Sequence, residues 1–246
     1  MSVLVELGRH IGIASLAGVI AGVAVGGLLG RVAMRVSGFM AGPEMVGART
    51  SAGERVGNIT FEGTLALIVF TGIGSGLLGG VLYAAVEPWL RRWRPWHGLV
   101  FGIGLLVAAS LSVLEPTNFD FVRFGSAPLN VVMFAALFVL FGVATAWLFE
   151  RLRGVVAGHG TVSNLVGVAA WITLLPASAA TLAALIGIET GPTSYQLPQV
   201  LLAGALAVAI VVHWRGLPRP IGYAALAVPM VAGVFRFAET LRRILE

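Results

Sequence analysis

Apolar and polar positions follow one another in long blocks along this chain: seven stretches are almost wholly apolar, and a polar segment separates each from the next. These stretches are about 15 to 24 residues long, and about 20 apolar residues let a helix cross the hydrocarbon layer of a bilayer. The pattern predicts an all-α, polytopic integral membrane protein, a single helical bundle over residues 1–246. The predicted spans are residues 11–30, 64–86, 98–114, 129–149, 165–188, 197–212 and 221–235.

The two ends of this pattern need separate interpretation. Residues 11–30 are expected to be a retained span, because the apolar core of a cleavable signal peptide is only about 7 to 15 residues long. The last span, 221–235, is short, but it is apolar on every face, whereas a helix lying on the membrane surface needs a polar face. We therefore expect it to cross, followed by an amphipathic tail over residues 236–246. The longest polar segment, 36–63, is expected to be an outer loop, either a connector or a docking cap.

The segment between the second and third spans sets the expected orientation. Arginines and tryptophans interleave there, which is typical of a cytoplasmic anchor, because arginine-rich loops stay inside and tryptophan rings prefer the headgroup layer. The short loops on this side carry seven arginines, and those on the other side carry one, Arg123. The N-terminus is therefore predicted to be cytoplasmic; only the arginines of the tail do not fit. The anchor residues are Trp89, Arg91, Arg92, Trp93, Arg94 and Trp96.

Glycines recur every four residues in the first two spans. This spacing places them on one face of each helix, where the missing side chains let another helix backbone approach closely. The first two spans are therefore predicted to pack on each other. The packing residues are Gly18, Gly22 and Gly26 in the first span and Gly72, Gly76 and Gly80 in the second.

Composition agrees with the membrane class and removes several kinds of chemistry. Hydrophobic residues make up 58% of the chain and charged residues 11%, against about 25% charged residues in a soluble domain. Lysine is absent, which excludes Schiff-base and pyridoxal chemistry. Cysteine is absent as well, which excludes disulfides and thiolate sites. Arginine in place of lysine, with much Ala, Gly and Val, predicts the cytoplasmic membrane of a GC-rich bacterium as the location.

The seven predicted apolar cores contain no Asp, Glu, His, Lys or Arg. Ionisable side chains inside the membrane are the usual mark of proton and ion pathways, so their absence argues against a proton-coupled pump. A path for an uncharged solute or a lipid would use hydroxyls, amides and broken helices instead. Its candidate lining residues are Asn130, Thr173, Pro176 and Ser178, with Pro176 expected to bend the fifth span.

The four histidines, His10, His97, His159 and His213, all fall at the predicted cytoplasmic boundary. Two of them on facing helices would suit haem or metal ligation, but no histidine pair has the spacing typical of a metal site. Neither a metal nor a cofactor is therefore expected. No nucleophile motif occurs in a strand-turn-helix context either, which favours a protein that is not an enzyme.

Charged residues also gather at the predicted outer rim, namely Arg31, Arg35, Glu115, Asp120 and Arg123. Phenylalanines alternate with polar residues between 115 and 124, so this loop is expected to lie half-immersed and to bring its carboxylates toward low dielectric. An arginine partner offsets much of that cost, because its planar fork holds a carboxylate bidentately. We therefore expect the loop to fold back and meet Arg31 or Arg35.

These observations favour a non-enzymatic packing or accessory subunit of a membrane complex. Its expected partners are the lipid bilayer and other membrane subunits or a second copy of the chain. A nucleic-acid role for the arginine and tryptophan segment is set aside, because that segment lies between apolar runs. The alternatives are a small permease or channel for an uncharged solute or a lipid and, further off, an interfacial haem or metal protein.

Overall fold

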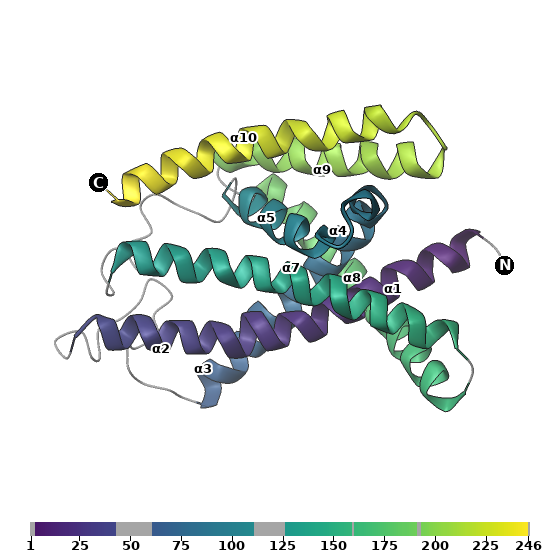
Figure 1. The fold of residues 1–246 in the computed structure, drawn as a ribbon, viewed down its shortest axis with the longest axis horizontal. Coiled ribbons are helices and arrows are strands. Elements are labelled where there is room, and N and C mark those ends of the chain that lie inside the picture. Colours follow the sequence, from purple (N-terminus) through teal and green to yellow (C-terminus); the bar gives the residue numbers. More distant parts are fainter. Residues whose placement is uncertain (1–2, 43–60, 111–125, 159, 191–192, 246) are drawn as a thin grey trace.

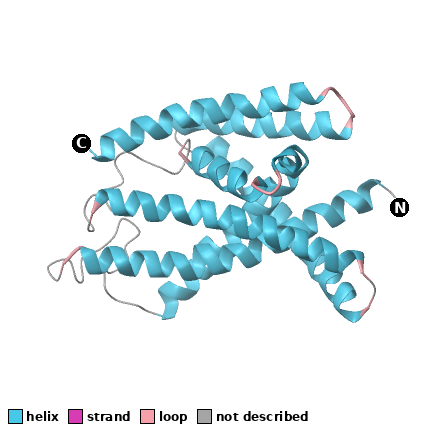
Figure 2. Ribbon diagram, in the orientation of Figure 1, coloured by secondary structure: helices cyan, strands magenta, loops and turns pink. Residues whose placement is uncertain are grey.

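The computed structural model describes residues 3–42, 61–110, 126–158, 160–190 and 193–245. Within these ranges every regular element is a helix, and no strand occurs (Figure 2). The all-α prediction is confirmed for this part of the chain. Helices suit these apolar runs because a helix satisfies its backbone hydrogen bonds within one segment, as the hydrocarbon layer requires.

The first two apolar stretches lie in helices that are longer than predicted. One unbroken helix consists of α1 (Val3–Ala21), the π-helical segment η1 (Gly22–Leu29) and α2 (Gly30–Met40). A second consists of α3 (Phe61–Ala66), the π-helical segment η3 (Leu67–Gly74) and α4 (Ser75–Leu90), followed by the short turn η4 (Arg91–Trp93). Both edges of the predicted loop 36–63 are therefore helical, and residues 43–60 lie outside the described residues.

The remaining helices also extend beyond the predicted spans. They are α5 (His97–Ala109), α7 (Ala127–Ala157), α8 (Thr161–Thr190), α9 (Thr193–Trp214) and α10 (Arg219–Leu245). The amphipathic segment 236–246 is not a separate tail, because α10 runs through it to Leu245 without a helix-breaking residue. Pro176 and Pro229 lie inside continuous helices, α8 and α10.

Five helical segments are long and apolar enough to cross a membrane: Val5–Met40, Phe61–Trp93, Ala127–Ala157, Thr161–Ala184 and Arg219–Arg243. Two shorter apolar helices, His97–Ala109 and Leu202–His213, correspond to the third and sixth predicted spans. The chain is thus a helical protein with several segments suited to membrane insertion.

Helices α1, α2, α7, α9 and α10 run roughly along one long axis, whereas α3 and α4 cross it obliquely, and the N- and C-termini lie at opposite ends (Figure 1). The connections from α7 to α8 and from α9 to α10 lie at the end that holds the N-terminus, which we call the N-terminal end. Helices α9 and α10 form an antiparallel pair along one side of the bundle. Helix α1 is central, because it packs against α4, α7 and α8.

Two seams between helices have almost no side chains in them. In the first, α1–η1 meets η3–α4: a Cβ atom placed on Gly76 would lie 2.5 Å from the carbonyl oxygen of Gly18, and one on Gly22 would lie 2.9 Å from the Cα of Gly76. In the second, α5 meets α7: a Cβ on Gly142 would lie 2.7 Å from the carbonyl oxygen of Gly98. Real Cβ atoms do not fit at such distances, so only glycine lets these backbones approach.

Candidate functional site

Glu87 lies near the end of α4, and its side chain is buried, with 1% of its surface exposed. It lies in the segment between the predicted second and third spans, which was expected at the membrane surface, but the fold buries it. Proline's fixed φ is compatible with a helix, although it removes a backbone hydrogen bond and crowds the carbonyl one turn earlier, and α4 continues through Pro88 to Leu90. Glu87 therefore lies one residue beyond the predicted span 64–86, within the helix Phe61–Trp93, which is long and apolar enough to cross a membrane.

Pro88 also accounts for the position of His10. Because proline has no N–H, the carbonyl oxygen of Ala84, four residues earlier, loses its helical partner. The Nε2 atom of His10 on α1 donates to that oxygen at 3.2 Å. A side chain from the neighbouring helix thus satisfies the backbone group that the proline leaves free.

Two arginines hold the carboxylate of Glu87. The Nε atom of Arg91 donates to its Oε1 at 2.7 Å, and a guanidinium nitrogen of Arg153 on α7 lies 3.9 Å from the same oxygen. The arginine side chains are 53% and 39% exposed, so this pairing opens to the surroundings on one side. Within the described residues, Glu87 Oε2 has no hydrogen-bond partner.

Glu150 of α7 extends this network. It accepts a hydrogen bond from Arg153 at 3.0 Å and pairs with Arg94, which precedes α5. Charge therefore joins α4, α7 and the connection between α4 and α5. Arginine suits such a shared role because its planar group carries several donors and stays charged.

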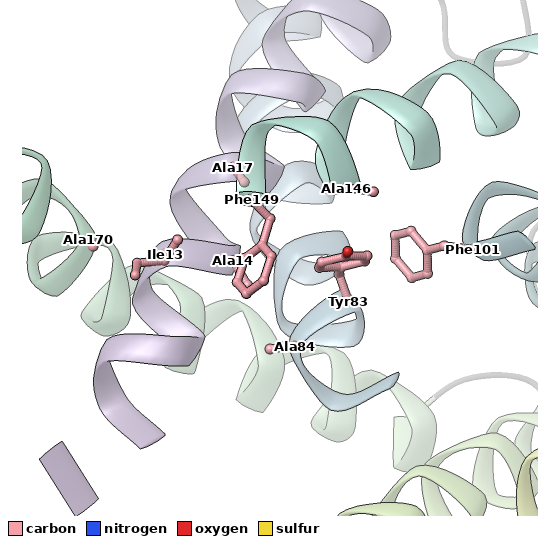
Figure 3. Close-up of a cluster of buried hydrophobic side chains, with 9 residues drawn as sticks. All are labelled: Ile13, Ala14, Ala17, Tyr83, Ala84, Phe101, Ala146, Phe149 and Ala170. Carbon is pink, nitrogen blue, oxygen red and sulfur yellow. The ribbon is translucent and has the colours of Figure 1, made fainter. Parts of the chain in front are cut away.

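Aromatic rings close the inner side of this network. Tyr83 is fully buried between Phe101 of α5 and Phe149 of α7, with ring centroids 5.0 and 5.3 Å apart (Figure 3). The imidazole of His10 meets the ring of Phe149 edge-on at 5.2 Å. Such edge-to-face contacts are favourable beyond their buried area. We call the following residues the Glu87 cluster: His10, Tyr83, Glu87, Arg91, Phe149, Glu150 and Arg153.

Three buried hydroxyl groups beside the cluster have no hydrogen-bond partner within the part of the chain that the structure describes. They belong to Tyr83, to Ser15 of α1 and to Thr145 of α7, and each of these residues is 0% exposed. An unsatisfied buried polar group costs about 1 to 3 kcal/mol. Among the described residues, four buried polar atoms without a partner, Oε2 of Glu87 and these three hydroxyl oxygens, therefore occur in this part of the bundle.

The six predicted anchor residues divide into two groups. Trp93 and Trp96 are 54% and 64% exposed, as a surface anchor requires. Trp89, in contrast, is buried against α9 and α10, and its backbone oxygen accepts a hydrogen bond from Tyr223 at 3.3 Å. The arginines belong to the network above, except Arg92, which is exposed.

The predicted cavity residues do not share one lining. Thr173 donates to the carbonyl oxygen of Gly12 at 3.1 Å, in the middle of α1, whereas Asn130 accepts from Ser37 of α2 at 2.6 Å. Those two contacts are 25 residues apart along one continuous helix, or about 37 Å at 1.5 Å per residue. The exposed residues Pro176 and Ser178 complete the set, and Ser178 donates to a carbonyl of its own helix.

Of the five residues predicted at the outer rim, the structure describes Arg31 and Arg35. Arg31 donates to the hydroxyl of Thr64 at 3.0 Å, and Arg35 is exposed. Their three expected companions, Glu115, Asp120 and Arg123, lie outside the described residues.

The histidines separate as well. His10 belongs to the Glu87 cluster, His97 is half-buried at the start of α5, and His213 lies against the ring of Trp89, with centroids 6.4 Å apart. His159 lies outside the described residues. Among those described, no three His, Asp or Glu side chains lie close enough together to hold a metal ion.

A signal for the Glu87 cluster is present in the sequence. Tyr83, Glu87 and Arg91 are four residues apart and therefore share one helix face if α4 continues through Pro88. The same spacing on α7 connects Thr145, Phe149 and Arg153. What the sequence does not contain is the register that brings the two faces together. Comparison of the chain with protein-family models, with curated proteins and with solved structures finds no match.

Proposed function

We propose that this chain is a non-enzymatic subunit of a larger assembly in the cytoplasmic membrane of a GC-rich bacterium. In this proposal it has seven spans and a cytoplasmic N-terminus, and α5 and α9 are the two short spans. The distribution of arginines among the connecting segments supports this orientation. The positions of the termini at opposite ends of the bundle support an odd number of spans, because an odd number of crossings leaves the termini on opposite sides of the membrane (Figure 1).

The observation that carries the proposal is an open glycine in the middle of α9. Inside a helix glycine is less favourable than alanine by roughly 0.5 to 1 kcal/mol, and the seam glycines of this protein offset that cost by close helix contact. Gly204 is exposed, and among the described residues no atom lies within 4 Å of a Cβ placed there. Val200, Val208 and Val211 are exposed on the same stretch of α9. This face suits a helix of another membrane protein or of a second copy.

A permease for an uncharged solute or a lipid remains the second candidate. Its proposed lining from Asn130, Thr173, Pro176 and Ser178 lacks support, because these residues are satisfied locally or lie far apart. An interfacial haem or metal protein lacks a set of ligands among the described residues.

The test is the variant Gly204→Leu, with Gly154→Leu as its control. Gly154 is equally open, but it lies near the end of α7, where no helix contact is proposed. We expect native mass spectrometry of gently solubilised membranes to show the wild-type chain in a stoichiometric assembly. Gly204→Leu should release the single chain with an unchanged Tm, and the control should not. A wild-type chain that is always alone and that transports solute in proteoliposomes would replace this proposal with the permease.

A further inference from the structure

We propose that the region behind Glu87 is a binding site for water, in which a hydrogen-bonded chain of water molecules connects Glu87 with the hydroxyls of Tyr83, Thr145 and Ser15. This chain would enter from the N-terminal end, past Arg91 and Arg153, and end inside the bundle. The proposal concerns a different part of the molecule from the α9 face and does not depend on it.

The register of α4 against α7 places these groups at successive levels along the bundle. A Cβ on Gly79 would lie 2.5 Å from the ring of Phe141, the ring of Tyr83 meets that of Phe149, and Glu87 faces Arg153. Each step is four residues on α4 and four or eight on α7, so the two helices run in the same direction. Thr145 lies halfway between Phe141 and Phe149 and therefore at the level between Gly79 and Tyr83.

The register of α1 brings Ser15 to the same level. Helix α1 runs opposite to α4: His10 bonds to Ala84, and a Cβ on Gly80 would lie 2.6 Å from the Cα of Ser15. From Glu87 to the level of Gly80 is seven residues, or about 10 Å along the axis. At a hydrogen-bond spacing of about 2.8 Å, about three water molecules bridge that length.

Water fits these groups better than an ion does. The carboxylate oxygen Oε2 of Glu87 accepts only, whereas the three hydroxyls both donate and accept, so a water molecule satisfies either kind of group. A metal cation would lie near three arginines, Arg91, Arg94 and Arg153, against the two carboxylates of Glu87 and Glu150. An anion would meet the carboxylate of Glu87 at the entrance. Ordered water is also the usual partner of buried polar groups that have no protein partner.

The glycine seam sets the inner end of this site. From Gly80 onward the backbones of α1 and α4 touch, so the site ends at the level of Ser15: a Cβ on Gly18 would lie 2.7 Å from the amide nitrogen of Gly80. No room for water exists between backbones at that separation. The hydrated site is therefore open to one side of the protein only.

Hydroxyl-radical footprinting by X-ray radiolysis tests this directly, because radicals form from water bound next to a side chain. We expect Tyr83 in the intact protein in lipid nanodiscs to be oxidised at least about tenfold faster than Leu77, after each rate is divided by that in the unfolded chain. Leu77 is a fair control, since it lies at the dry seam and is 6% exposed, against 0% for Tyr83. Equal normalised rates for the two residues would overturn the proposal.

Replacing the hydroxyl-bearing residues by residues of similar shape gives an independent test, because the Tm should fall if water is bound and rise if it is not. If water bonds to them, Tyr83→Phe and Thr145→Val each lower the Tm by a few degrees, because a hydrogen bond is lost. If the region is dry, the same changes raise the Tm, because an unsatisfied buried group is removed. Ser178→Ala, at an exposed hydroxyl that bonds within its own helix, should leave the Tm unchanged. A rise for both variants would sink the water site.

Discussion

The same two helices, α1 and α4, build two very different regions within a few turns of each other. Along the seam, Gly18, Gly22 and Gly76 let the backbones touch, and no side chain intervenes. At the N-terminal end, the glycine repeat stops at Gly80; its next position is Ala84, and the adjacent Tyr83 packs its ring between Phe101 and Phe149. A glycine contact and a cluster of aromatic and charged side chains therefore lie next to each other on the same two helices.

This difference shows how residue size sets the chemistry. Between touching backbones a polar side chain has no space, so the seam is held by van der Waals contact alone. Around His10, Tyr83 and Phe149 the contacts are made by rings instead, and Glu87 pairs with Arg91 and Arg153 beside them. The close approach of the seam also fixes the register of α1 on α4, and this register brings His10 to Ala84.

The largest loss of stability is expected from replacing a seam glycine by a large residue. Leucine at Gly76 would push its side chain into the backbone of α1, where nothing flexible can give way. Overpacking usually costs about 1 to 3 kcal/mol, and a backbone collision should reach or exceed the top of that range. We expect Gly76→Leu, and likewise Gly22→Leu, to leave little folded protein by fluorescence-detected size exclusion and thermal stability.

The matched control is Gly104→Ala on α5, where the nearest atom, Sδ of Met230, lies at 3.8 Å. It should keep or slightly raise the Tm, because alanine favours the helix. Full tolerance of Gly76→Leu would mean that the seam does not set the distance between α1 and α4.

The second largest loss of stability is expected at the Glu87 cluster, from Glu87→Ala. Removing the carboxylate leaves Arg91 and Arg153 side by side without their shared acceptor. Breaking a fully buried pair costs about 3 to 5 kcal/mol, but both arginines are partly exposed, so we expect about 1 to 2 kcal/mol. Thermal unfolding in micelles measures this loss. Restoring most of it with the double variant Glu87→Ala, Arg153→Ala would show that like charges cause the loss, and a second full loss would contradict this.

The seam could be predicted from the sequence because its signal is local. A four-residue glycine step determines a helix face, and two such faces in neighbouring spans suggest a pair. The second seam, of Gly98 and Gly102 with Gly142, is harder to predict, since α7 contributes a single glycine and no repeat. The Glu87 cluster was missed because a proline after an apolar run suggests the end of a helix, whereas Pro88 lies within one.

Tertiary contacts also decide which tryptophans of the predicted anchor reach the surface. Trp89 and Trp93 look alike in sequence, both next to a charged loop. Only the packing of α9 and α10 on the end of α4 distinguishes them, and it buries Trp89 while Trp93 stays exposed. Helix ends differ from prediction for a simpler reason, since polar residues continue a helix as well as apolar ones where no proline or glycine intervenes.

A smaller effect, of about 1 kcal/mol, is expected from His10→Phe. The change keeps an aromatic ring against Phe149 but removes the hydrogen bond to the carbonyl of Ala84. In the background Pro88→Ala the loss should vanish, because the amide of residue 88 then bonds to that carbonyl within α4. A double-mutant cycle on unfolding free energies measures the coupling. An equal loss in both backgrounds would show that the hydrogen bond of His10 is unrelated to the proline.

The smallest effect is expected from an ion pair that has neither burial nor a shared partner. Glu239 and Arg243, one turn apart on α10, pair with side chains that are 54% and 55% exposed. Such pairs contribute about 0.3 to 0.5 kcal/mol on a helix, because water screens the charges. Glu239→Gln should therefore lower the Tm by less than one degree, and this small loss should vanish at high salt. A loss as large as that of Glu87→Ala would mean that charge alone, and not the buried setting behind the seam, makes Glu87 important to the fold.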